Sequence, residues 1–179
     1  METSTNKSEA DAVVGSADYN HLETLLPKEL RNYKDEYWKK RTFAPSCLIY
    51  YIGLNEKIPN MVHHTLFFEN DLDPHIYSIY ESKQWPDKPL FYVCCPSKTD
   101  ASVAPLGHEN LFLLMPIAND LDDDEKIREH YLNEMIERIE IKTGIKNLHS
   151  KIVYRKSYSV SNFKEDYFAY GGNAYGLAN

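Results

Sequence analysis

Two apolar runs between Pro45 and Phe68 are predicted to be strands that organise the rest of the chain. Residues 47–52 are apolar at every position and rich in Ile and Tyr, so no alternation marks a water-facing side. A short run of β-forming residues bounded by Pro and Gly predicts a strand buried on both faces. Residues 65–68 are predicted to form the neighbouring strand, which follows a polar connecting segment.

Three further apolar runs predict strands at 76–80, 90–94 and 110–117, joined by polar loops and turns. Five strands in succession with such connections favour a mixed, largely antiparallel sheet. The segment 151–160 alternates apolar and basic residues. We expect it to be a partly exposed strand at a sheet edge, where Lys and Arg discourage unwanted pairing.

The clearest helical pattern follows the predicted sheet. Acidic residues at 122–125 would lie at its N-terminus, where the helix dipole favours negative charge, so they need no bound ion to explain them. Gly144 sits at the C-terminal capping position. An apolar stripe at spacings of three and four should pack on the sheet: Ile127, Tyr131, Leu132, Met135, Ile136 and Ile139.

The N-terminal part predicts a different kind of element. Residues 12–14 form an apolar run that stops at a Gly-Ser turn, which predicts a short buried strand. Asp18 is placed to cap a short helix at 19–26, and 27–41 has the spacing of an amphipathic helix. A strand followed by a loop and a helix is an α/β element.

Composition limits the possible partners. The chain of 179 residues carries a net charge of -7 and has no Lys/Arg cluster of the kind that follows phosphates, so we expect no nucleic-acid partner. Fourteen tyrosines suit half-buried sheets and pocket walls.

No apolar run approaches the ~20 residues of a spanning helix, and the N-terminus lacks the apolar core of a signal peptide. We expect a cytoplasmic protein, with any membrane contact peripheral to the inner face.

Cysteine and histidine do not predict a reactive site. Three cysteines, two of them adjacent, argue against a disulfide framework, and Cys47 and Cys94 are expected to be buried thiols. His63 and His64 are adjacent in a predicted strand and should point to opposite faces, so we predict no metal site. No serine-nucleophile, P-loop or dinucleotide fingerprint is present. The residues alone fit a domain that binds an apolar ligand.

Four segments, taken in order, resemble the C-terminal half of the bacterial and fungal phytoene (carotenoid) desaturases, flavin enzymes of carotenoid biosynthesis. They are ADAVVGSADYNHLETLLP at 10–27, APSCLIYYIGLNEKIPNMVHHTLFF at 44–68, PLFYVCCPSKTDASVAPLGHENLFLLMPI at 89–117 and GGNAYGLAN at 171–179. The runs HHTLFF and SVAPLGH are the most specific. The resemblance covers almost the whole chain.

The resemblance implies an FAD-dependent oxidoreductase of the amine-oxidase-like architecture. Its fold class would be α+β or α/β, with a substrate domain built on a mixed, largely antiparallel sheet and an incomplete FAD domain. Residues 1–26 would be a returning strand and helix of the FAD-binding domain, 27–160 the substrate-binding domain and 161–179 a re-entry to the flavin side. The Gly-rich fingerprint that holds the FAD pyrophosphate is absent. We therefore expect a fragment that is inactive alone.

The same resemblance implies the ligands and the candidate residues. The substrate would be an apolar polyene such as phytoene or another carotene, bound in a tunnel and dehydrogenated by hydride transfer to FAD. Candidate tunnel walls are Tyr50, Leu66, Phe67, Phe68, Phe112 and Leu114. Candidate flavin-proximal residues are Gly172, Asn173, Tyr175 and Gly176, because glycine-rich backbone can approach a flavin closely. No catalytic residue is assigned. The alternatives are a non-enzymatic domain that binds apolar ligands and a related flavin-dependent carotenoid isomerase or oxidoreductase.

Overall fold

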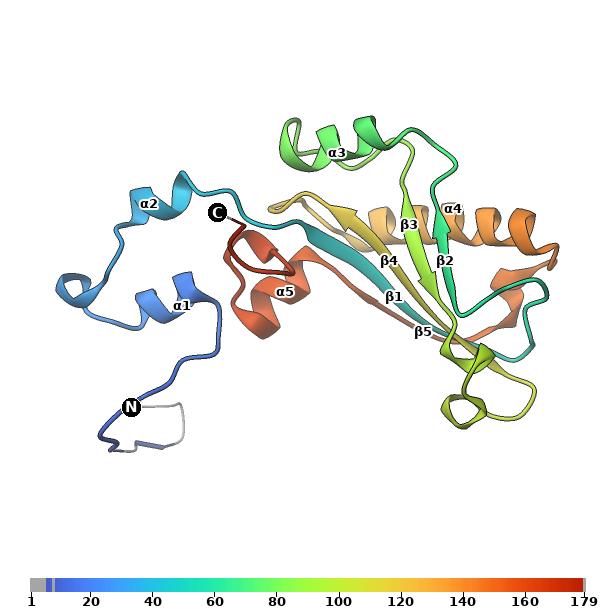
Figure 1. Cartoon of the computed structure of the whole chain (residues 1–179), viewed down its shortest axis with the longest axis horizontal. Coiled ribbons are helices and arrows are strands. Elements are labelled where there is room, and N and C mark those ends of the chain that lie inside the picture. The colour runs from blue at the N-terminus through green and yellow to red at the C-terminus, as the bar shows by residue number, and fades with distance from the viewer. Residues whose placement is uncertain (1–5, 8, 179) are drawn as a thin grey trace.

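The computed structural model describes residues 6–7 and 9–178, and its central element is a five-stranded sheet (Figure 1). The strands are β1 (Ser46–Leu54), β2 (His64–Phe67), β3 (Phe91–Cys94), β4 (Glu109–Ile117) and β5 (Ile152–Tyr158). Their order is β2-β3-β4-β1-β5, and all neighbouring strands are antiparallel. The predicted α+β class is confirmed, as is the edge position of the basic strand, which is β5.

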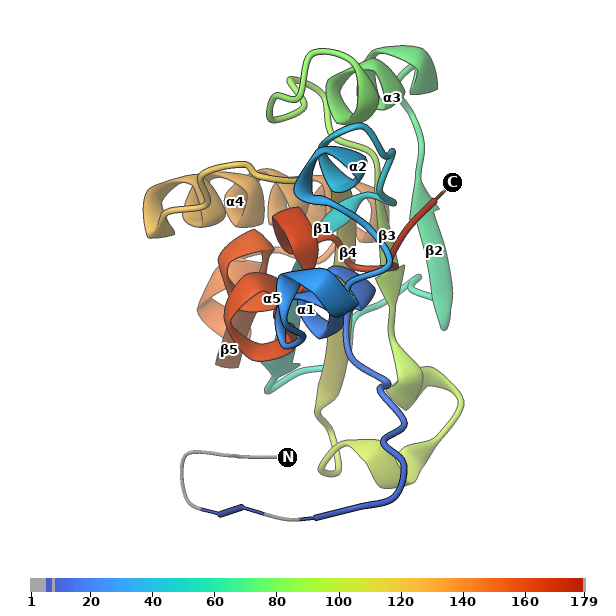
Figure 2. The ribbon, with the colours of Figure 1, turned by 90° about the vertical axis from the view of Figure 1, so that its left-hand side faces the viewer.

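One long helix, α4 (Glu125–Thr143), covers one face of this sheet (Figure 2). Its N-terminus is capped by Asp124, whose carboxylate accepts a hydrogen bond from the amide of Ile127 at 2.9 Å. It ends at Gly144, which has a φ of 78°. This is the left-handed conformation that favours glycine after a helix. The predicted helix, its caps and its apolar stripe are therefore confirmed.

The core lies between α4 and the sheet. Alternate residues of β4 are fully buried in it, namely Leu111, Leu113, Met115 and Ile117. Tyr50 of β1 reaches the same layer, where its hydroxyl donates to the carbonyl of Arg128 in α4. Burial raises the pKa of Tyr50 well above its usual range, which keeps the hydroxyl protonated as a donor.

The segment predicted as a strand at 76–80 is helical instead, and it belongs to α3 (Leu72–Tyr80). Asp71 caps this helix by accepting a hydrogen bond from the amide of Asp73 at 3.2 Å. His75 then ties it to the sheet, because its Nε2 bonds the carbonyl of Pro116 at 2.8 Å and its Nδ1 accepts from the amide of Leu90 at 2.9 Å. A short apolar run does not distinguish strand from helix by its periodicity, and here capping and tertiary bonds decide.

The N-terminal expectation is only partly met. The buried strand predicted at 12–14 is wrong, because Val13 and Val14 are 65% and 93% exposed. No strand pairs with this segment among the described residues. The capped helix is confirmed as α1 (Tyr19–Thr24), with Asp18 at its N-cap. The second helix, α2 (Asp35–Lys39), is shorter than predicted and follows a 3-10 turn at Lys28–Leu30.

The C-terminal part returns to the start of β1. After β5 comes α5 (Val160–Tyr167), and a glycine-containing loop follows it. The amide of Ala174 donates to Pro45, and Gly176 accepts from Ala44, each at 3.0 Å. Asp18 accepts hydrogen bonds from the Tyr170 amide and the Asn173 side chain, at 3.3 and 3.4 Å. The N-terminal and C-terminal segments, which the family resemblance predicts to belong to the flavin side, therefore contact each other.

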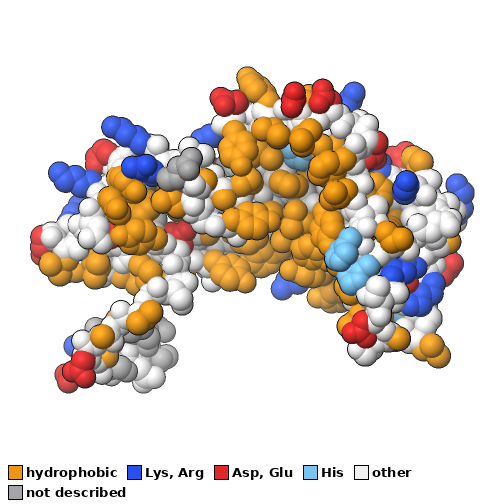
Figure 3. All heavy atoms as spheres, viewed as in Figure 1, with side chains coloured by type: hydrophobic (Ala, Val, Ile, Leu, Met, Phe, Trp, Pro, Cys, Tyr) orange, Lys and Arg blue, Asp and Glu red, His pale blue; other side chains and the backbone are white. Residues whose placement is uncertain are grey.

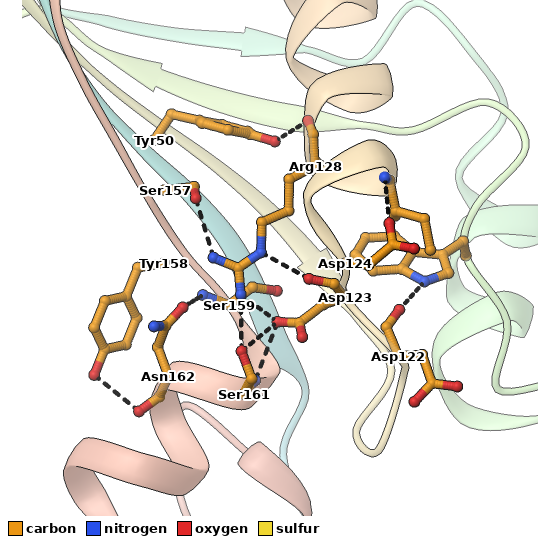
Figure 4. Close-up of polar contacts among 12 residues, drawn as sticks. Tyr50, Asp122, Asp123, Asp124, Arg128, Ser157, Tyr158, Ser159, Ser161 and Asn162 are labelled. Atoms are coloured by element: carbon orange, nitrogen blue, oxygen red, sulfur yellow. Dashed lines mark hydrogen bonds and ion pairs between the residues drawn. The ribbon is translucent and has the colours of Figure 1, made fainter.

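A polar cluster joins α4 to β5 and α5 (Figure 4). Arg128 lies at its centre and pairs with Asp123 at 2.7 Å, with both side chains nearly buried. The same guanidinium donates to the hydroxyls of Ser157 and Ser161. The Asp123 carboxylate also accepts a hydrogen bond from the amide of Ser161 at 3.0 Å.

None of the described helices has the length and apolar character needed to cross a membrane.

Candidate functional site

The sheet face turned away from α4 is largely uncovered and apolar, and we call it the open face (Figure 3). Since side chains alternate along a strand, the register assigns to this face the residues that lie between the core residues. On β1 to β4 the open face consists of His64 and Leu66 of β2, Tyr92 and Cys94 of β3, Phe112, Leu114 and Pro116 of β4, and Cys47, Ile49 and Tyr51 of β1. On β5, the register adds Lys156 and Tyr158.

The C-terminal loop covers one end of the open face. Cys47 is only 1% exposed, and its thiol lies 3.6 Å from the hydroxyl of Tyr175. Burial raises the pKa of the Cys47 thiol to about 11, so it stays protonated and unreactive at neutral pH. Tyr51 and Leu66, farther along the face, are 44% and 63% exposed. The uncovered part therefore spans four strands, from β1 to β2.

Aromatic rings form a row across these strands. Tyr51 and Phe112 have ring centroids 5.5 Å apart, Phe112 and Tyr92 are 6.4 Å apart, and Tyr92 and His64 are 5.9 Å apart. Each ring comes from a different strand. Conjugated or apolar ligands can lie against such a surface, because the rings offer large apolar area and their π faces. Tyr51 and Tyr92 were not predicted, although their alternation with Tyr50 and Phe91 is a signal in the sequence.

The six predicted tunnel residues are divided between the two faces of the sheet. Leu66, Phe112 and Leu114 lie on the open face. Tyr50 and Phe67 lie in the core between the sheet and α4. Phe68 follows β2, is 51% exposed, and lines a shallow groove of about 540 Å³ with Leu66, Arg138 and Ile141. Their role in binding a ligand stays a prediction.

A second groove, of about 700 Å³, lies where the N-terminal segment meets α5 and the C-terminal loop. Asn173 and Gly176, two of the predicted flavin-proximal residues, are among those that line it, together with residues 16–18. The Asn173 side chain is held by its bond to the carbonyl of Tyr170 at 2.8 Å. Gly176 has a φ of 89°, and a Cβ placed there would meet nothing within 4 Å. Its backbone is therefore open to close approach, as the prediction for a flavin requires.

The other two predicted flavin-proximal residues do not line that groove. A Cβ at Gly172 would lie 2.6 Å from the carbonyl oxygen of Val160, so packing within the chain requires glycine there. Tyr175 is 65% exposed, and its hydroxyl contacts Cys47 at the covered end of the open face. Of the four residues, Asn173 and Gly176 line this groove, and the role of all four toward a flavin stays a prediction.

The expectation that His63 and His64 point to opposite faces is wrong. Strand β2 begins only at His64, so the alternation rule does not reach back to His63. The two rings stack with centroids 4.1 Å apart.

Two cysteines were expected to be buried. Cys47 is buried, whereas Cys94 is only partly buried and lies on the open face beside the two histidine rings.

Comparison with known proteins gives a consistent picture. No protein-family model matches the chain. The carotenoid 3,4-desaturase of Haloarcula japonica is 46% identical over 170 residues, which are 94% of this chain and 34% of that protein. A 4,4'-diapophytoene desaturase (4,4'-diapolycopene-forming) of Methylomonas is 29% identical, over 94% of this chain and 34% of the relative. The zeta-carotene-forming phytoene desaturase of Myxococcus xanthus is 31% identical, over 95% of this chain and 33% of the relative.

These similarities extend over nearly the whole chain and are not confined to one motif. The chain spans about a third of the length of the relatives it matches. By this similarity, the chain belongs to the carotenoid desaturase family.

Proposed function

We propose that this chain is the polyene-binding part of an FAD-dependent carotenoid desaturase, an oxidoreductase of carotenoid biosynthesis. The observation that carries the proposal is the open face, with its row of rings from Tyr51 to His64. Contiguous exposed apolar surface of this kind marks a binding site in soluble proteins. The names of the relatives, which act on carotenoids, supply the class of ligand.

The open face suits a polyene for a physical reason. Such a ligand has no polar group to pair along its length, so its binding rests on removing apolar area from water, at roughly 25 cal/mol per Å². Leu66 and Leu114 offer aliphatic surface beside the rings. The substrate class is an apolar polyene such as phytoene or another carotene. Because such molecules partition into lipid, the proposal includes peripheral contact with the inner face of a membrane.

The second groove is the candidate site for FAD in this proposal, because two of the predicted flavin-proximal residues line it. Asn173 and Gly176 would shape the wall of this groove, because the Asn173 side-chain amide already bonds Tyr170, Asp18 and the Gly176 amide. Bound FAD supplies a two-electron acceptor for the hydride that leaves the polyene when a new carbon–carbon double bond forms. The open face would bind and orient the polyene and keep water from the reacting carbons. No residue of this chain is assigned as the proton acceptor.

A chimeric enzyme tests the proposal. Residues 1–179 would replace the matching third of the Haloarcula japonica relative. The purified chimera would then be supplied with acyclic carotenes as substrates. We expect new conjugated double bonds, seen as a shift of the visible absorption to longer wavelength. Flavin absorbance of the purified chimera is the control for cofactor binding. An unchanged carotene spectrum with FAD bound would contradict the proposal.

Two alternatives predict different results. A non-enzymatic domain for apolar ligands would leave the chimera inactive with FAD bound, while the 179-residue chain alone would take up a polyene. A related flavin-dependent isomerase or oxidoreductase would give products with altered geometry or added oxygen and no new double bond. Product analysis by chromatography and mass spectrometry separates the three cases.

A further inference from the structure

Three side chains with metal-binding atoms meet at the β2–β3 end of the open face. His64 and Cys94 are direct partners across the two antiparallel strands, so their side chains lie on the same face. His63 joins them because its carbonyl accepts the amide of Cys95 at 2.7 Å, which fixes its backbone beside β3. One ligand atom from each of the three residues lies within 4.8 Å of the others.

Hydroxyl groups already hold both imidazole rings by the same nitrogen. The Nδ1 of His63 lies 2.6 Å from the hydroxyl of Thr99, and the Nδ1 of His64 lies 2.5 Å from that of Tyr92. Each ring therefore keeps its Nε2 atom for another partner, and the described residues provide no hydrogen bond to either atom. A hydrogen bond at the second ring nitrogen is the usual way in which proteins orient metal-binding histidines.

Tyr92 also connects the second ring to the thiol. Its hydroxyl bonds His64, and the Cys94 thiol lies close to that hydroxyl, two residues further along β3 on the same face. One side chain thus lies beside two of the three candidate ligands. Among the described residues, the side chains that contact the cluster by hydrogen bonds are those of Thr99 and Tyr92.

The donor set points to a particular class of ion. Two imidazoles and one thiolate suit borderline-soft divalent ions such as Zn²⁺ and Co²⁺, whereas Mg²⁺ and Ca²⁺ prefer oxygen ligands. Ligand atoms around a tetrahedral zinc ion lie roughly 3.3–3.8 Å apart, given its bond lengths. The candidate ligand atoms lie within 4.8 Å of one another, so binding would require the two stacked imidazole rings to turn until one nitrogen of each points at the ion.

We propose that His63, His64 and Cys94 form a binding site for a divalent zinc-like metal ion, with a fourth position open to water or a ligand. Binding displaces the proton of the Cys94 thiol, which leaves to solvent as the sulfur–metal bond forms. The site does not rest on the proposed function. It would exist whether or not the chain binds a polyene or FAD.

Cobalt titration of the 179-residue chain under reducing conditions tests the proposal. We expect one Co²⁺ per chain, visible ligand-field bands of a tetrahedral ion, and a near-ultraviolet band from charge transfer between sulfur and cobalt, all displaced by Zn²⁺. Cys94→Ser should abolish the sulfur band. His64→Asn should weaken binding at least tenfold, and Tyr92→Phe, which removes only the supporting bond, by about tenfold.

The adjacent thiol supplies the matched control. Cys95 follows Cys94 directly but is buried on the core side, so Cys95→Ser should keep the sulfur band. If that variant unfolds, Cys47→Ser serves instead, since its thiol lies at the covered end of the face. The absence of a sulfur band in the unmodified chain, its persistence in Cys94→Ser, or equal cobalt affinity in all variants would overturn the proposal.

Discussion

Arg128 and Asp123 form a nearly buried ion pair at the start of α4. Their Nη2 and Oδ2 atoms lie 2.7 Å apart, and the two side chains are 10% and 8% exposed. Arg128 bonds Ser157 of β5 and Ser161 of α5 as well (Figure 4). The Arg128 guanidinium therefore connects α4, β5 and α5 on the face of the sheet that α4 covers.

Removing this guanidinium should destabilise the chain strongly. Arg128→Met leaves the Asp123 carboxylate buried without its counter-charge, and breaking such a pair costs about 3–5 kcal/mol. The matched control is Arg155→Met, because Arg155 pairs with Glu129 at 2.6 Å where both side chains are more than a third exposed. That loss should be about 0–1 kcal/mol. Urea denaturation measures both, and similar losses in the two variants would refute the role given to Arg128.

The open face can be tested by making it polar without touching the core. Leu66→Asn should weaken polyene binding by about tenfold or more, since burying a leucine side chain contributes about 1.5–3 kcal/mol. The control is Leu30→Asn, because Leu30 is equally exposed, at 64% against 63%, but lies far along the chain in a 3-10 turn. Both variants should keep their stability within about 0.5 kcal/mol. Polyene absorption shifts report the binding, and equal affinities would contradict the assignment of the face.

Gly172 should tolerate no side chain. It has a φ of 69°, and a Cβ would lie 2.6 Å from the Val160 carbonyl oxygen, a backbone atom that cannot move alone. Gly107→Ala is the control, because Gly107 has a φ of 80° but open space around it, so only the backbone conformation costs energy, about 1–2 kcal/mol. We expect Gly172→Ala to lose clearly more than that in thermal or urea denaturation. Equal losses would show that the loop shifts freely away from α5.

Stability should fall when the solution is made mildly acidic, because of His75. Burial lowers the pKa of this imidazole from 6.5, and its Nδ1 must stay unprotonated to accept the Leu90 amide. A lowered pKa in the folded state means that its contribution is complete above pH ~6.5 and is lost as pH falls from there through the folded-state pKa. Urea midpoints between pH 8 and 5 should show this decline.

His75→Gln provides the comparison for that decline. Glutamine offers an acceptor for Leu90 and a donor for Pro116 but does not titrate. The variant should therefore have a flatter pH dependence than the unmodified chain. An identical slope in both proteins would assign the acid sensitivity to other groups.

The sequence by itself determined the elements whose signals are local. Helix α4 could be predicted with its boundaries because a capping Asp124, an apolar stripe and Gly144 all act within a few residues of one another. Strand β4 could be predicted because residues 111–115 form a short apolar run that follows a long polar loop and ends at Pro116. The family resemblance was likewise present in the residues, and the comparisons agree with it.

Only the tertiary structure decided which side of each strand lies on the open face. A period of two separates Phe112 from Leu113, and Tyr50 from Tyr51, but both members of each pair are apolar, so the pattern does not say which one α4 will cover. The structure turns Leu113 and Tyr50 inward and leaves Tyr51 and Phe112 on the open face.

The same limit explains the other departures. Residues 76–80 are helical in a helix that Asp71 caps locally and that the two hydrogen bonds of His75 join to distant positions in the chain. His63, His64 and Cys94 meet because two strands pair in one register. Hydrogen bonds and packing between distant segments are formed only when the chain folds, so local pattern determined the elements, and tertiary contacts determined the surface that they build.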